Sequence, residues 1–362
     1  MFFRRRRRRA APPSDQAPAP VPIPAVEPAE PWAAEWSTGL APSHGEPISS
    51  VATAVVGGRT VAVTAGRDGV ARVWEVDGGR LLGELPVGRW GSVALSALGD
   101  APVVLAVGDY RPEFAWDLAS GRCLQTLPAD DAMAVTTTVL DGRPVAVTCH
   151  EDGTVGGWDL GDVRQPARQF GRPVGGHGFA LHAVAAAAVG GRLLAVSSSG
   201  MNADQSWDED VRLWDLTAGT PVAVFDAART SSVDAVALAD LDGRPVVATA
   251  DWQGTVRLWE PSPGGRRQDD GVELRGHTAG VWTLAVTTLS GRPTLASGCD
   301  DGTVRRWDLA TRQQIGQMLR FPHPVRALAA APGDRLVVCF GPNVAVLAPE
   351  RPSGAEAGRV SG

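Results

Sequence analysis

The chain has 362 residues and a formal net charge of −6, and all 34 of its basic residues are arginines. No apolar run approaches the roughly 20 residues of a membrane helix, so the sequence excludes a helical membrane protein. With 43 glycines and 28 prolines available for turns, we expect a cytoplasmic all-β protein without a membrane span. Four cysteines without C-x-x-C spacing predict free thiols rather than a metal centre.

The first 31 residues form a separate segment. Six consecutive arginines, Arg4 to Arg9, precede a Pro/Ala-rich stretch that ends at Pro31. Because such a stretch cannot build a core, we expect residues 1–31 to be disordered. The arginine run has two interpretations. It is an electrostatic arm that contacts an anionic surface (nucleic acid, lipid or an acidic partner), or it is a solvated tail, including one created by a start codon assigned too early.

A repeat occupies most of the remaining chain. Each unit contains alternating apolar residues that indicate a strand a, a hairpin, a strand b, a turn and a strand c, which ends in Trp followed by an acid. The intervals between these Trp residues are 42, 42, 56, 45 and 48 residues, near the roughly 40–45 residues of a four-stranded propeller blade. The six pairs are Trp74-Glu75, Trp116-Asp117, Trp158-Asp159, Trp214-Asp215, Trp259-Glu260 and Trp307-Asp308.

Two incomplete segments remain. Residues 325–350 indicate strands a, b and c of a seventh unit without its Trp, and residues 33–42 belong to no unit and are free to supply strand d. Pairing them would remove the exposed edges of an open ring. We therefore predict a seven-bladed β-propeller over residues 32–350, with four-stranded antiparallel blades and closure by an N-terminal strand in the last blade. We expect a disordered tail over residues 351–362.

On these motifs the chain resembles the WD-repeat β-propeller family, and its composition is similar to that of actinomycete-type bacterial WD-repeat proteins. The resemblance implies hydrogen-bonded tetrads of His, Ser or Thr, Asp and Trp that stabilise single blades, and blades two, five and seven are expected to be less stable than the others. The third repeat keeps Thr148, Asp152 and Trp158 but lacks the His. The implied tetrads are His44, Thr64, Asp68 and Trp74; His177, Ser197, Asp208 and Trp214; and His277, Ser297, Asp301 and Trp307.

The resemblance also implies a partner-binding top face, formed by residues near the start of strand a and by those just before the tetrad Asp. Three Trp residues, Trp207, Trp252 and Trp282, occupy such positions on blades four to six. Exposed Trp is unfavourable unless a partner covers it, although each of these could instead pack flat against its own loops. The other positions carry His182, Asp234, Asp300, Glu151, Met133, Asp131, Arg89 and Arg326, together with Ser49, Ser232, Arg67 and Asp109.

A catalytic constellation does not emerge from the sequence, which contains no P-loop, no G-x-S-x-G and no H-E-x-x-H. We predict a monomeric, non-enzymatic scaffold without catalytic residues, cofactor or metal, which binds a protein or peptide partner of basic character through Trp anchors and carboxylates. The alternative is a propeller enzyme of the lyase or hydrolase type with its site at the central channel. Carboxylate, His and Arg side chains clustered in that channel would favour the enzyme, and small residues would favour the scaffold.

The charge of the ring bears on the kind of partner. Without residues 1–31 the chain carries 28 basic and 37 acidic residues, a formal charge of −9. This balance disfavours nucleic acid as a ligand of the propeller body.

Overall fold

The computed structural model describes most of the chain between residues 32 and 349. The predicted disordered tails, residues 1–31 and 351–362, lie outside the described residues. The described ranges are 32–37, 43–88, 91–98, 101–107, 114–117, 122–126, 131–161, 167–178, 180–199, 210–227, 232–262, 267–269 and 271–349.

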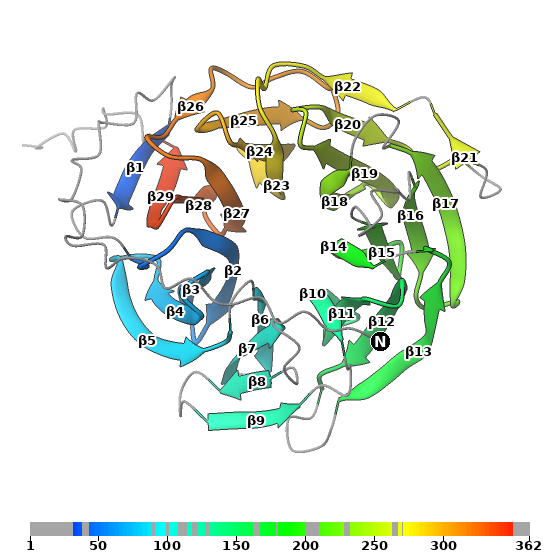
Figure 1. Ribbon diagram of the computed structural model, residues 1–362, viewed down its shortest axis with the longest axis horizontal. Coiled ribbons are helices and arrows are strands. Elements are labelled where there is room, and N and C mark those ends of the chain that lie inside the picture. Colours follow the sequence, from blue (N-terminus) through cyan, green and yellow to red (C-terminus); the bar gives the residue numbers. More distant parts are fainter. Residues whose placement is uncertain are drawn as a thin grey trace, which may run out of the picture.

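The protein is an all-β propeller of seven blades arranged in a ring (Figure 1). Blades one to three are β2 (Ile48–Val56), β3 (Arg59–Gly66), β4 (Val70–Glu75) and β5 (Arg80–Pro86); β6 (Ser92–Leu98), β7 (Ala101–Val107), β8 (Phe114–Asp117) and β9 (Arg122–Thr126); and β10 (Ala132–Leu140), β11 (Arg143–His150), β12 (Thr154–Asp159) and β13 (Arg168–Gly175). The described residues include no helix, and so none long and apolar enough to cross a membrane.

The remaining four blades continue around the ring in chain order. Blades four and five are β14 (Leu181–Val189), β15 (Arg192–Ser199), β16 (Asp210–Asp215) and β17 (Thr220–Asp226); and β18 (Val233–Leu241), β19 (Arg244–Asp251), β20 (Val256–Trp259) and β22 (Val272–Leu274). Blades six and seven are β23 (Val281–Leu289), β24 (Arg292–Cys299), β25 (Thr303–Asp308) and β26 (Leu319–Arg320); and β27 (Val325–Ala331), β28 (Arg335–Phe340), β29 (Asn343–Pro349) and β1 (Trp32–Ser37).

Two blades contain a strand from elsewhere in the chain. In blade seven, β1 lies beside β29 and pairs with it antiparallel, from Trp32 opposite Pro349 to Ser37 opposite Ala345 (Figure 1). Blade four departs from the predicted four strands, because β21 (Arg267–Gln268), from the chain segment between β20 and β22, pairs parallel with β17 as a fifth strand. The long connection in blade five thus covers an outer edge that would otherwise be open.

Local sequence explains the regular parts of each blade. The hairpin between β10 and β11 turns at Asp141 and Gly142, whose φ angles of 49° and 74° belong to the left-handed region that Gly and Asp tolerate best. The following strand b is apolar on both faces, and in β11 the six residues after Pro144 are all buried. Both faces are covered because each blade packs between two neighbours.

The core consists of separate clusters, each shared by adjacent blades. Trp307 of blade six packs with Val256 of blade five, and Trp74 of blade one packs with Val337 and Val344 of blade seven. Each such Trp therefore stabilises its own blade and the interface with the preceding one. Because Trp74 uses blade seven in this way, apolar packing continues across the junction between the two ends of the chain.

Candidate functional site

The b–c turns and the starts of strands a lie at one end of the blades, which we call the top face. In blade six, the Trp307 indole N–H donates to Ser297 Oγ at 2.9 Å, and His277 Nε2 lies 2.7 Å from the same oxygen. His277 Nδ1 lies 3.2 Å from Thr303 Oγ1, which donates to Asp301 Oδ1 at 2.6 Å. The structure thus connects Trp, Ser, His and Asp in one chain of hydrogen bonds, with Thr303 inserted.

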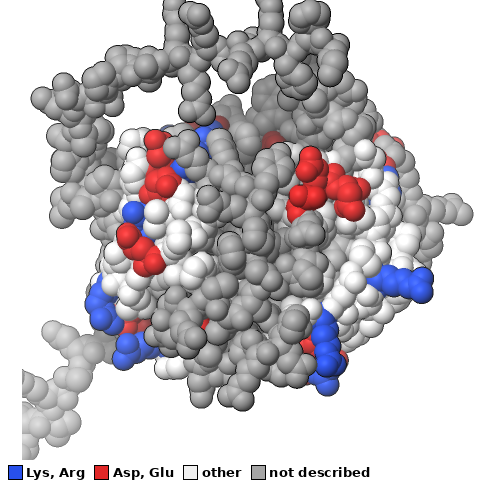
Figure 2. Space-filling view, turned by 60° about the horizontal axis from the view of Figure 1, so that its bottom comes forward, with Lys and Arg blue, Asp and Glu red and all other residues white. Residues whose placement is uncertain are grey.

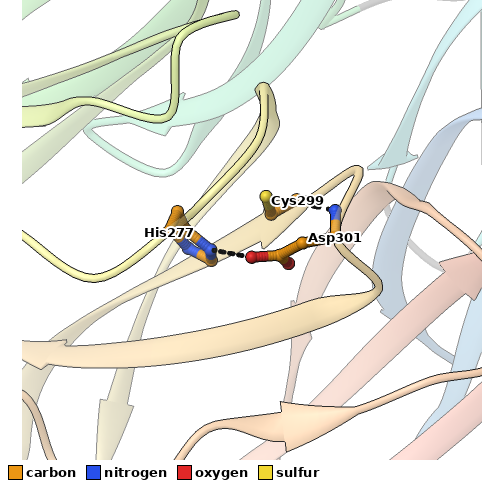
Figure 3. Close-up of side chains that lie close together, drawn as sticks. All are labelled: His277, Cys299 and Asp301. Atoms are coloured by element: carbon orange, nitrogen blue, oxygen red, sulfur yellow. Dashed lines mark hydrogen bonds and ion pairs between the residues drawn. The ribbon is translucent and has the colours of Figure 1, made fainter.

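A thiol lies beside this chain of hydrogen bonds in blade six. The possible ligand atoms of His277, Cys299 and Asp301 lie within 4.8 Å of one another, and the side chains of His277 and Asp301 point toward each other (Figure 3). Burial raises the pKa of Cys299 to about 12 and lowers that of His277 to about 4, so the thiol stays protonated and the imidazole neutral at pH 7. Both nitrogens of His277 already have partners, so the trio is best described as a tetrad with a neighbouring thiol.

Blade one holds the same four residue types in a slightly different arrangement. Trp74 donates to Thr64 Oγ1 at 2.9 Å, His44 Nε2 lies 2.8 Å from that oxygen, and His44 Nδ1 lies 3.2 Å from Asp68. Arg72 donates to Asp68 at 2.8 Å. Although burial opposes it, hydrogen bonds from Arg72 and His44 hold the pKa of Asp68 at about 2.

Blade three contains a histidine that the sequence comparison missed. The Trp158 indole donates to Thr148 Oγ1 at 2.8 Å, and His150 Nε2 lies 2.9 Å from the same oxygen. His150 follows Thr148 by two residues on strand b, whereas the other tetrad histidines precede strand a. The tetrad position ahead of strand a carries no histidine in blade three, as the sequence indicates, and His150 reaches Thr148 from strand b instead, because residues i and i+2 of a strand share a face.

The other blades hold partial arrangements. In blade four, Trp214 donates to Ser197 at 2.9 Å and His177 lies 3.0 Å from Ser197, whereas Asp208 lies outside the described residues. In blade five, Trp259 donates to Thr249 at 3.0 Å.

Most of the predicted partner-binding residues near strand a occupy β-bulges. In six blades, the pairing of strand a with strand b shifts by one residue directly after the first strand position. A bulge leaves one residue unpaired and re-aims its side chain, here at the inner rim of the top face. The residues in the bulges are Ser49, Met133, His182, Asp234, Trp282 and Arg326.

At two junctions, between blades five and six and between blades six and seven, the b–c turn of one blade contacts the bulge of the next, and we call each of these junctions a notch. In the notch between blades six and seven, Arg326 donates to both carboxylate oxygens of Asp300 at 3.0 Å. Its guanidinium carbon lies 4.8 Å from the centre of the Trp282 ring. Asp300 and one face of Trp282 are therefore already engaged within the protein.

The notch between blades five and six brings together Asp234, Trp252 and Trp282. A Cβ atom on Gly280 would lie 3.1 Å from the Trp252 Cα and 3.2 Å from Trp282 Nε1, so glycine permits this close approach. Trp252 is 49% exposed, whereas Trp282 Nε1 and Asp234 Oδ2 are buried without a hydrogen-bond partner in the described part of the chain. Burial, reinforced by repulsion from Asp251, raises the pKa of Asp234 to about 6.

The remaining predicted residues lie apart from this notch. Asp131, Glu151, Met133 and His182 are exposed on blades three and four, and the backbone N–H of Glu151 donates to the Asp131 carbonyl at 3.2 Å. Trp207, Arg89 and Asp109 lie outside the described residues. Of the three predicted Trp anchors, the structure therefore brings two together.

One repeat of the chain matches a known family model. Residues 271–308, which include most of blade six, match the WD40 model described as WD domain, G-beta repeat. This match and the seven-bladed ring support a WD-repeat β-propeller. Comparison with curated proteins gives no match. WD-repeat propellers are typically protein-interaction scaffolds and are generally non-enzymatic.

The central channel has a volume of about 430 Å³ and is lined by the strands a of all seven blades. Its described lining consists of Ser, Thr, Ala, Val and Leu and includes no titratable side chain. Several lining hydroxyls are used between blades: Thr137 Oγ1 donates to the Leu95 carbonyl at 2.8 Å, and Ser50 Oγ accepts from Val93 N at 3.1 Å. The channel wall therefore holds the inner strands together.

Proposed function

We propose that this protein is a non-enzymatic scaffold that binds a protein or peptide segment of basic character on the top face, centred on blades five and six. The observation that carries the proposal is the notch with Trp252 and Trp282. A half-exposed indole beside unpartnered polar atoms is unfavourable in the free protein, and a covering partner would remove that cost.

The channel lining supports the scaffold over the alternative enzyme. General acid–base chemistry requires titratable side chains placed near one another, and the described lining carries none. The surface charge favours a protein partner over nucleic acid. On the face shown in Figure 2, acidic side chains gather in small groups, and the described basic side chains form no continuous stripe.

The proposal is tested by site-specific photo-crosslinking in the source cell. A photoreactive phenylalanine analogue at position 252 should capture a defined partner. The same analogue at position 139, where Val139 is 58% exposed at the opposite end of blade three, should not capture it. In a parallel pull-down, Trp252→Ala should weaken capture by about 2 kcal/mol, the loss typical of a hot spot. Capture from position 139 and from position 252 alike, or full capture by Trp252→Ala, would place the binding surface elsewhere.

A further inference from the structure

Two neighbouring notches of the ring are built from equivalent positions. Trp252 and Asp300 are each the first residue after strand b, in blades five and six. Asp234, Trp282 and Arg326 each occupy the bulge at the start of strand a, in blades five, six and seven. The notch between blades five and six therefore corresponds, residue for residue, to the notch between blades six and seven.

The second of these notches binds a guanidinium within the protein. Arg326 forms two hydrogen bonds with the Asp300 carboxylate and stacks on the Trp282 ring. Two parallel hydrogen bonds to a carboxylate, combined with stacking on an aromatic face, are the contacts that distinguish arginine from lysine.

The notch between blades five and six offers a carboxylate and an aromatic face, and among the described residues no guanidinium pairs with that carboxylate. The Asp234 carboxylate accepts from Ser232 at 3.2 Å through Oδ1 and is also stabilised by the backbone N–H of Trp252, while Oδ2 has no partner of ordinary hydrogen-bond geometry among the described residues. Asp251 lies close enough to repel it, and the Arg257 guanidinium lies 3.9 Å from Asp251. The Trp252 side chain is half exposed.

We propose that this notch binds the guanidinium of an arginine side chain supplied by the partner, an inference that rests on the proposed scaffold function. The arginine would donate to Asp234, stack on Trp252 and offset the repulsion between Asp234 and Asp251. Asp234 as a whole is partly exposed at the top face, whereas its Oδ2 is buried, so binding of the arginine requires a displacement of the groups that cover this oxygen. Asp300 takes no part because Arg326 already occupies it.

The test uses the full chain labelled with 5-fluorotryptophan and followed by fluorine NMR. The probes are two blocked tripeptides, acetyl-Ala-Arg-Ala-amide and its citrulline counterpart, which has the same shape without the charge. The arginine peptide should shift the resonances of Trp252 and Trp282 saturably, with an affinity at least about tenfold above that of the citrulline peptide. These two resonances are assigned with Trp252→Phe and Trp282→Phe.

Two variants show whether the carboxylate is responsible. Asp234→Asn should lose about tenfold or more in affinity for the arginine peptide. Asp242→Asn, which removes an exposed carboxylate from the hairpin between β18 and β19 at the opposite end of blade five, should stay within about twofold of the unmodified protein. Equal binding of the two peptides, or full affinity in Asp234→Asn, would overturn the proposal.

The chain itself contains another source of guanidinium groups, Arg4 to Arg9. If the peptide binds only after these six arginines are replaced by serine in the full chain, the segment itself occupies the notch. The proposal that a partner supplies the arginine is then overturned. The scaffold function is judged separately. If Trp252-dependent capture of a partner persists without arginine selectivity, only this inference fails. If that capture is also lost, the proposed scaffold function is contradicted as well.

Discussion

Blades one and five use their carboxylates in opposite ways. In blade one, Asp68 receives hydrogen bonds from Arg72 and a contact from His44, and its pKa falls to about 2. In blade five, Asp234 is half-buried with an unpartnered oxygen, and its pKa rises to about 6. The first carboxylate is stable when ionised, whereas the second is stabilised by a proton or a bound cation. Blade five lacks a full tetrad, and it is also the blade whose carboxylate a bound cation would stabilise.

The largest expected effect concerns the ring on which both blades depend. Deleting residues 1–42 removes β1 and leaves the edge of β29 unpaired, so the protein should unfold or aggregate. Deleting residues 1–30 leaves β1 intact and should barely change the melting temperature. Thermal unfolding followed by circular dichroism checks both variants, and equal tolerance of the two deletions would contradict closure by β1.

The next largest effect is the loss of stability when the complete tetrad of blade six is broken. His277→Ala and Asp301→Ala should each lower the free energy of unfolding by about 1–3 kcal/mol, because buried partners lose hydrogen bonds. The double variant should cost less than the sum, since both residues belong to one network. Denaturant titration of all four proteins measures the coupling, and strict additivity would show that the two side chains act independently.

A smaller effect is the opposite pH dependence of the contributions that Asp234 and Asp68 make to the free energy of unfolding. The folded protein binds more protons at Asp234 than the unfolded chain, so this residue lowers stability as pH rises from about 4 to 6. Asp234→Asn should therefore match the unmodified protein near pH 4 and exceed its free energy of unfolding above pH 6, by on the order of 2 kcal/mol. Urea titrations at pH 4 and 7 provide the comparison.

Asp68→Asn is the matched variant and should behave in the opposite way. The pKa of Asp68 is depressed, so its contribution to stability is present above pH 4 and disappears as pH falls to about 2. The variant should be less stable at pH 7 and lose less on acidification. A gain of stability at pH 7 in Asp68→Asn, or a loss in Asp234→Asn, would reverse the contrast between the two blades.

Sequence periodicity was sufficient for the number and order of the blades, because alternation and turn residues act locally and recur in every unit. It could not reveal β21, since the parallel pairing of Arg267 and Gln268 with β17 depends on where a long connection lies in space. The contact of His150 with Thr148 could have been predicted from their spacing of two residues on one strand, but the family pattern places the tetrad His ahead of strand a.

The candidate site was predictable only as a set of positions. The sequence placed Asp300, Trp282 and Arg326 on the top face as contacts for a partner. The structure shows that they bind one another across two blades. Such pairing depends on the distance between neighbouring blades, which a single repeat does not specify. The difference between the two notches, and with it the unpartnered state of Asp234, therefore required the three-dimensional arrangement.

The pairing of β1 with β29 also ties the fold to the order of synthesis. Trp32 and Pro349 lie opposite each other although they are 317 positions apart in the chain. Contacts of such separation form late, because the entropy of closing a long loop opposes them. On the ribosome, β1 emerges ahead of every blade and must wait for its partner until the last one has been translated. The ring therefore closes only after its last blade has been translated.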